Sequence, residues 1–206
     1  MVAQASVEFH RPAPKPKPAP RRYTLEEYLR REEKSVHKHE FYNGKIIRMG
    51  YARGPHNEIA VNVMAALKTA IRLAEKKYRI FSSDQKIYLP ALNFGLHPDA
   101  VVVSEQPAYW DDNKLLLINP LLIVEVLSKS TRGYDRGGKF DEYKTLPSFR
   151  EYVLVEQDKV YVESRFREEP GLWRETVQTE PGGEIFLKSI GCAISLADVY
   201  ENIEFD

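Results

Sequence analysis

The chain has 206 residues, of which 43% are hydrophobic and 29% are charged, an ordinary composition for a folded protein. Lys and Arg number 30, as do Asp and Glu, so nucleic-acid binding would need a local basic patch or a metal ion. The single cysteine, Cys192, excludes an internal disulfide and a cysteine metal cluster. No apolar run approaches the roughly 20 residues of a membrane span, and the N-terminus lacks a secretory signal. We therefore expect a cytoplasmic protein without membrane contact.

The predicted elements begin after a proline-rich segment. Residues 1–22 carry prolines at every second position from 12 to 20, which predicts an extended tail, and residues 23–206 are expected to form one folded domain. Thr24 and Glu27 form a capping box for a short helix to about residue 31. Residues 41–49 predict a hairpin that turns at Asn43-Gly44. Apolar residues at helical spacing predict a helix over about 55–75.

The second half alternates strands with one predicted helix. Strands are expected over 79–89, 100–103 and 121–127, followed by a single helix over 134–146 that ends before Pro147. Further strands are predicted over 151–155, 160–166, 172–177 and 185–187, and Ser195 marks a last short helix. This order predicts an α/β (α+β) fold, with a mixed central sheet flanked by helices and with β-hairpins at both ends.

Two acidic residues occur at short apolar strands. Asp99 follows Pro98 directly before Ala-Val-Val-Val, and Glu125 lies inside Leu-Leu-Ile-Val-Glu-Val-Leu. A carboxylate in such a run is costly to bury unless it is paired, hydrogen-bonded or bound to a cation. Two such strands side by side would present both carboxylates to one hard divalent ion. The alternatives are a strand-end cap for Asp99 and a buried salt bridge from Glu125 to Lys139 or Arg136.

A basic segment with a tyrosine follows the second acid. Asp135, Lys139 and Tyr143 are spaced by four residues, so a continuous helix would place them near one face. Two glycines inside that helix, Gly137 and Gly138, would cost about 2 kcal/mol relative to alanine. Either the helix starts after them or another group approaches closely. Carboxylates beside a lysine suit metal-assisted phosphodiester hydrolysis, although an Asp–Lys pair at this spacing is often only a surface ion pair.

This ordered set of residues resembles a known family. The chain is similar to the Uma-type endonucleases, a branch of the restriction-endonuclease-like PD-(D/E)XK superfamily, from about residue 23 to the C-terminus. The residues that carry the resemblance are Tyr23 to Leu29, residues 40–44, His56, Pro98-Asp99, Glu125-Val126-Leu127-Ser128, Asp135, Lys139, Tyr143 and Glu151-Tyr152. The resemblance implies a Mg²⁺ (or Mn²⁺) site at Asp99 and Glu125, with the backbone carbonyl of Val126 as a further ligand. It also implies catalysis by Asp99, Glu125 and Lys139.

The chain departs from the family pattern at three places. The superfamily has a lysine two residues after the second acid, where this chain has Leu127, and Lys139 in the following helix takes over that role in this branch. Lys129 stands where the branch usually has proline. Residues 41–44 replace an acidic turn, which weakens the case for a role of this hairpin in metal binding. The missing lysine keeps open a catalytically weak or inactive protein.

We therefore expect a Mg²⁺-dependent endonuclease that acts on nucleic acid, DNA rather than RNA. One alternative is a catalytically weak or inactive nuclease-fold module that binds nucleic acid or a protein partner. A second is carboxylate-based glycoside hydrolysis, which needs neither metal nor lysine. Exposed hairpins at both ends make a homodimer a further expectation. Accessory roles are predicted for Glu40, His56, Gln85, Ser128, Asp135 and Tyr143, and phosphate contacts for Lys129, Arg132 and Arg136.

Overall fold

The computed structural model describes residues 21–205, so almost all of the predicted tail over 1–22 lies outside the described residues. A six-stranded mixed sheet has the order β11-β10-β9-β8-β6-β3. At its centre, β8 (Leu122–Leu127) runs parallel to β9 (Glu151–Glu156) and antiparallel to β6 (Ala100–Val103). The other strands are β10 (Val162–Glu169), β11 (Leu172–Gln178) and β3 (Arg79–Ser82). The expected mixed sheet is thus confirmed.

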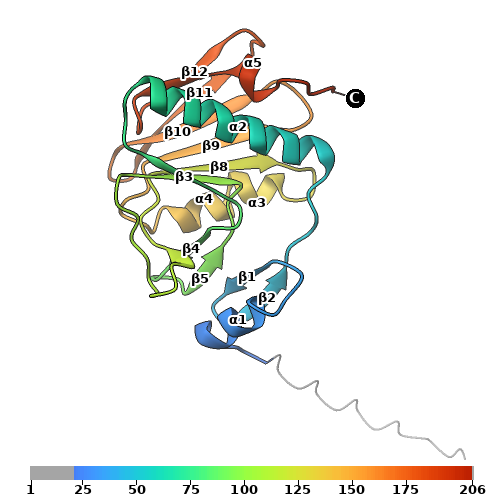
Figure 1. Ribbon diagram of the computed structural model, residues 1–206, viewed down its shortest axis with the longest axis vertical. Coiled ribbons are helices and arrows are strands. Elements are labelled where there is room, and N and C mark those ends of the chain that lie inside the picture. The colour runs from blue at the N-terminus through green and yellow to red at the C-terminus, as the bar shows by residue number, and fades with distance from the viewer. Residues whose placement is uncertain (1–20, 206) are drawn as a thin grey trace, which may run out of the picture.

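Helices cover the two faces of this sheet (Figure 1). Val124 and Val126 contribute to a core shared with α2 (Gly54–Leu73), with α5 (Leu196–Val199) and with the hairpin of β12 (Glu184–Leu187) and β13 (Cys192–Ser195). Ile123 and Leu127 contribute to a second core, which includes residues of α4 (Gly138–Tyr143). Because side chains alternate along a strand, Glu125 shares the α4 side with these two residues.

A second sheet, of order β2-β1-β5-β4-β7, carries the N-terminal part of the described chain. Its strands are β1 (His39–Tyr42), β2 (Lys45–Arg48), β5 (Phe94–Leu96), β4 (Lys86–Leu89) and β7 (Leu116–Leu117). The predicted hairpin is confirmed: Asn43 and Gly44 have φ of 43° and 92°, a left-handed pair that Asn-Gly adopts readily. The predicted capping box between Thr24 and Glu27 is also present and starts α1 (Leu25–Glu32).

One predicted strand is wrong in its extent. The segment 79–89 forms two strands in different sheets, with β3 in the central sheet and β4 in the second. A turn separates them, closed by a 3.0 Å hydrogen bond from the N–H of Gln85 to the carbonyl of Ser82. Turn-forming residues 82–85 interrupt the apolar pattern there. Within residues 21–205, no helix has both the length and the apolar character needed to cross a membrane.

The single helix predicted over 134–146 is also wrong. The segment forms α3 (Arg132–Arg136) and α4, joined at Gly137, whose φ of −120° and ψ of −87° break the helix. Glycine adopts such a conformation at low cost. Close approach also occurs, because a Cβ on Gly138 would lie 2.8 Å from the ring of Tyr134. Of the two explanations offered, close approach of another group is confirmed at Gly138, whereas the helix does not start after both glycines: Gly137 breaks it and α4 begins at Gly138.

Replacing Gly138 by alanine is expected to lower the free energy of unfolding by about 1–3 kcal/mol. The added Cβ would displace the Tyr134 ring, whose hydroxyl bonds Glu142 and Tyr42. The matched control is Gly133→Ala in α3, where nothing lies within 4 Å of the added Cβ. That change should be neutral or stabilising, because alanine favours a helix by up to about 1 kcal/mol. Urea denaturation measures both, and equal effects of the two substitutions would contradict the expectation.

Candidate active site

Asp99 directly precedes β6, at the point where this strand begins beside β8. Its backbone N–H donates to the carbonyl of Val124 at 3.2 Å, and its Oδ2 accepts the N–H of Val126 at 2.7 Å. These bonds fasten Asp99 to the backbone on both sides of Glu125. The side-chain bond to Val126 also means that the strand-end cap, the alternative role of Asp99, is present in the structure.

Glu125 is only 3% exposed, in the middle of β8. Lys139 Nζ lies 2.8 Å from its Oε1, and the hydroxyl of Tyr143 donates to the same oxygen at 3.1 Å. The alternative of a buried salt bridge is therefore realised with Lys139 and not with Arg136. Within residues 21–205, no side chain or backbone group donates to Oε2, so this oxygen is left for another ligand.

Lys139 is buried on α4 and lies among several carboxylates. Its Nζ is 3.9 Å from Glu40 Oε1 and 3.8 Å from Asp135 Oδ1, and it donates to the carbonyl of His97 at 3.3 Å. We call the four carboxylates at this position the acidic cluster, which consists of Glu40, Asp99, Glu125 and Asp135. Although α3 and α4 are separate helices, the four-residue spacing still brings Asp135, Lys139 and Tyr143 to one place.

Glu40 reaches the acidic cluster from β1 of the second sheet. Its Oε1 accepts the N–H of His97 at 3.2 Å, and its Oε2 accepts the hydroxyl of Tyr42 at 2.6 Å. The sequence of residues 41–44 weakens the case for a role of this hairpin in metal binding. Its first strand, β1, nevertheless places a carboxylate in the cluster. Sequence reasoning missed Tyr42 and its neighbour Tyr134, whose hydroxyls are 3.0 Å apart. The available signal was the two-residue spacing of Glu40 and Tyr42, which places both on one face of a strand.

The acidic cluster carries more negative than positive charge. Burial raises the pKa of Glu125, and nearby Asp99 and Asp135 raise it further against the opposing effect of Lys139. Burial also raises the pKa of Asp135. Burial alone would lower the pKa of Lys139, but the surrounding carboxylates raise it, so the ammonium stays charged. Three carboxylates, those of Glu40, Glu125 and Asp135, thus lie within 4 Å of one lysine, and Asp99 acts on Glu125, so a bound cation would relieve the repulsion within the cluster.

The oxygen donors of this site suit one class of metal ion better than another. Among the residues the structure describes, no three His, Cys, Asp or Glu side chains converge on one point. A structural zinc site needs four protein ligands, whereas Mg²⁺ is commonly held by one or two carboxylates, with water and phosphate oxygens completing its shell. Asp99 and Glu125 supply two carboxylates, the donor set of the second pattern, so their chemistry fits Mg²⁺ or Mn²⁺.

His56 lies beside Asp99 at the start of α2. Its Nε2 is 3.4 Å from Asp99 Oδ2. Burial lowers the pKa of His56, but Asp99 and the carbonyl of Val126 outweigh this effect and raise it. His56 is thus adjacent to Asp99, one of the two predicted metal ligands, and its accessory role stays a prediction. Ser128, by contrast, bonds the hydroxyl of Thr131 at 2.9 Å and closes the turn after β8.

The three predicted phosphate contacts differ in their surroundings. Arg132 Nη2 lies 2.6 Å from Glu156 Oε2, and Arg136 is paired with Glu156 and Glu163. Both guanidinium groups already form ion pairs with carboxylates, so the role of these arginines in phosphate binding stays a prediction. Lys129 is exposed and lines the cleft described below, as a phosphate contact requires.

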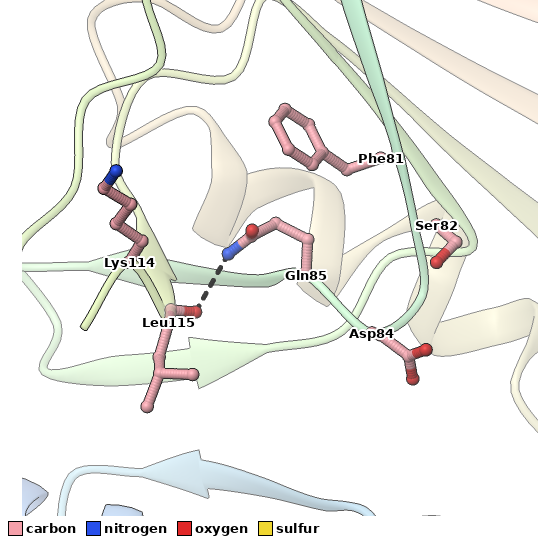
Figure 2. Close-up of a pocket in the computed structure, with 6 residues that line it drawn as sticks. All are labelled: Phe81, Ser82, Asp84, Gln85, Lys114 and Leu115. Carbon is pink, nitrogen blue, oxygen red and sulfur yellow. Dashed lines mark hydrogen bonds between the residues drawn. The ribbon is translucent and has the colours of Figure 1, made fainter.

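Gln85 does not line the cleft with Asp99, contrary to expectation. Its Nε2 donates to the carbonyl of Leu115 at 2.9 Å, which turns the side chain into a separate hollow of about 210 Å³ (Figure 2). The cause is the turn at residues 82–85, which carries the chain away from β3 and leaves Gln85 directly before β4 of the second sheet.

The whole acidic cluster borders one large cleft of about 1210 Å³, together with Lys139 and His56. The cleft also reaches β2, the start of α2 and the loop after β8. A mixed sheet that offers two carboxylates at β6 and β8, with a lysine from α4, defines a restriction-endonuclease-like protein. The comparison with known families identifies the branch: the Uma2 family model, described as "Putative restriction endonuclease", matches residues 25–197, and the chain belongs to this family.

Two relatives from Synechocystis sp. (strain ATCC 27184 / PCC 6803 / Kazusa) resemble the chain. "Uncharacterized protein sll1609" is 37% identical over 65% of this chain and 75% of its own length. "Uncharacterized protein slr1290" is 33% identical over 94% of this chain and 96% of its own length. The fold also matches a crystal structure from Anabaena variabilis ATCC 29413, described as "a putative nuclease belonging to DUF820". Its TM-score is 0.66 at 18% identity, covering 86% of this chain and 97% of that one. The chain is therefore a nuclease-like protein in fold and family.

Proposed function

We propose that this protein is a divalent-metal-dependent endonuclease that hydrolyses phosphodiester bonds, in DNA rather than RNA. The observation that carries the proposal is the acidic cluster, with a charged lysine 2.8 Å from Glu125 at the wall of an open cleft. A buried excess of carboxylates is unfavourable without a cation, and an open cleft admits a polymeric substrate. The family description, a restriction endonuclease, supports DNA as the substrate.

Each residue of the site has a role in this reaction. Asp99, Glu125 and the Val126 carbonyl would hold Mg²⁺ or Mn²⁺, which when bound activates water and offsets charge on the phosphate. The Lys139 ammonium would stabilise the negative charge that develops on the phosphate during attack. Tyr143 donates to Glu125 and the N–H of Val126 to Asp99, so both carboxylates are oriented before a ligand arrives. His56 would help to orient Asp99.

The test is calorimetric titration of Mg²⁺ or Mn²⁺ into wild type and a Glu125→Gln variant, with plasmid nicking followed on the same samples. We expect both binding and nicking in the wild type, and the loss of both in the variant, because an amide is a weaker ligand than a carboxylate. Asp141→Asn is the matched control, since Asp141 also lies on α4 but is 68% exposed and pairs with Lys144 rather than with the acidic cluster. A wild type that binds no metal would contradict the proposal.

A second candidate is a catalytically weak or inactive module that binds nucleic acid. The observation that favours it is the engagement of Glu125 Oε1 by both Lys139 and Tyr143, which leaves one free oxygen for a metal. Such a module would bind nucleic acid equally well as the wild type and as the Glu125→Gln variant, and the wild type would not nick. Nicking that depends on Glu125 excludes it.

A further inference from the structure

The cleft that holds the acidic cluster is bordered by exposed apolar side chains. Of the eleven large hydrophobic residues exposed on the described chain, six line this cleft: Val36, Ile47, Tyr51, Val61, Tyr134 and Phe205. Val36 is 92% exposed and Tyr51 is 79% exposed. Exposed apolar groups gathered at one site, rather than scattered, indicate a surface that binds a partner.

Three cations lie along the same cleft: Arg48 on β2, Arg53 before α2 and Lys129 after β8. All three are exposed, and none has a carboxylate within 4 Å in the part of the chain that the structure describes. The other lysines of the cleft are paired, Lys38 with Asp84 and Lys139 with Glu125. The unpaired cations therefore remain available to an anionic partner. Two copies of the chain docked through this same surface would bring like charges together, which disfavours a dimer formed there.

Tyr51 is an exposed aromatic residue at the rim of the cleft and lies next to Arg48, one of the unpaired cations. Its hydroxyl is 2.9 Å from His37 Nδ1, the guanidinium of Arg48 lies 5.7 Å from its ring centre, and the His37 ring meets it edge-on. His37 and Arg48 thus hold the ring in place while it stays largely open to solvent. A fixed, exposed aromatic ring beside an arginine is the arrangement on which unpaired nucleobases stack.

We propose that Tyr51, His37 and Arg48 form a stacking platform for an unpaired base, so that the cleft takes single-stranded nucleic acid or the single-stranded part of a larger substrate. A duplex stacks its bases inside and presents mainly sugar and phosphate, to which the apolar rim is not complementary. A single strand offers base faces to the rim and phosphates to Arg48, Arg53 and Lys129. This inference rests on the proposed nuclease function and adds the form of its substrate.

The test measures binding of fluorescein-labelled oligo(dT) and of a duplex of equal length by fluorescence anisotropy, with EDTA present so that no cleavage occurs. Tyr51→Leu is expected to weaken oligo(dT) binding about 5- to 100-fold, with little effect on the duplex. Tyr51→Phe keeps the ring and should bind as the wild type does. Arg48→Gln should reduce the salt dependence of oligo(dT) binding by about 0.7 in log–log slope.

The matched control is Tyr23→Leu, because Tyr23 also lies near arginines, Arg21 and Arg31, but does not line the cleft. It should leave binding unchanged. The proposal is overturned if Tyr51→Leu binds oligo(dT) like the wild type, if it weakens both ligands equally, or if the wild type does not bind oligo(dT). It is also overturned if light scattering shows a dimer that Tyr51→Leu dissociates without a loss of oligo(dT) binding.

The two proposals fail separately. Metal titration and nicking test the nuclease function, while oligo(dT) binding in EDTA requires neither metal nor cleavage. Tyr51-dependent binding without nicking would support the platform and contradict the nuclease. Glu125-dependent nicking without Tyr51-dependent binding would support the nuclease and contradict the platform.

Discussion

Replacing Lys139 with methionine is expected to lower plasmid nicking by about 10²–10³-fold, because the variant loses the positive charge that faces the phosphate in the transition state. Methionine fills similar space but carries no charge. Mg²⁺ binding should persist or strengthen, since the ammonium that competes for Glu125 at 2.8 Å is gone. The combination of retained metal binding and lost nicking distinguishes a catalytic lysine from one that only pairs with Glu125. Titration calorimetry and a nicking assay on the same samples measure both quantities.

The matched control for this prediction is Lys144→Met. Lys144 directly follows α4, is about one third exposed, and is paired with Asp141 rather than with the acidic cluster. Its replacement should leave nicking within about twofold of the wild type, because a partly exposed ion pair contributes little. Normal nicking by Lys139→Met would contradict the assignment of this residue. It would leave the Glu125–Lys139 pair with a structural role only.

Glu163→Leu is expected to lower the free energy of unfolding by about 3–5 kcal/mol, because it removes one partner of a buried ion-pair network. The Glu163 side chain is 1% exposed and pairs with Arg136 of α3 and with Arg165 of β10. Arg165 also donates to the carbonyl of Arg136, so the network fastens α3 to the sheet. For a chain of this size the melting temperature should fall by about 6–20 °C.

Glu175→Leu is the control, since Glu175 is 54% exposed and lies 3.6 Å from the same Arg165. It should cost less than about 1 kcal/mol. Equal losses in the two variants would contradict the network as the cause. Thermal unfolding followed by circular dichroism measures both variants against the wild type.

The effect of Glu163 is also expected to depend on pH. Burial opposes ionisation, but Arg136 and Arg165 outweigh it and hold the pKa of Glu163 below its usual value. Such a carboxylate stabilises the fold above the unfolded pKa of about 4.3, and this contribution is lost as the pH falls through the lower folded pKa. The stability gap between wild type and Glu163→Leu should therefore be constant near neutral pH and shrink below about pH 4. A gap that is the same at pH 3 and pH 7 would contradict this reasoning.

Local sequence patterns predicted the elements whose geometry depends on near neighbours. The capping box at Thr24 and the Asn43-Gly44 turn are confirmed because a few adjacent residues fix their backbone dihedrals. The burial of Glu125 followed from its apolar neighbours in the chain. The two wrong elements have a different origin: residues 79–89 and 134–146 each contain a turn or a break whose effect depends on what packs on either side.

The sequence by itself determined that Asp99 and Glu125 are carboxylates that would be costly to bury in apolar strands. Lys139 was singled out by its spacing from Asp135 and Tyr143 and by the family resemblance. Only the tertiary structure decided that Lys139 pairs with Glu125 and that Glu40, from the other sheet, joins the same cluster. It also separated Gln85 from the site and engaged Arg132 and Arg136 in ion pairs. The physical reason is that hydrophobic period and turn chemistry act over a few residues. The convergence of side chains instead depends on strand order and on the packing of helices against the sheet.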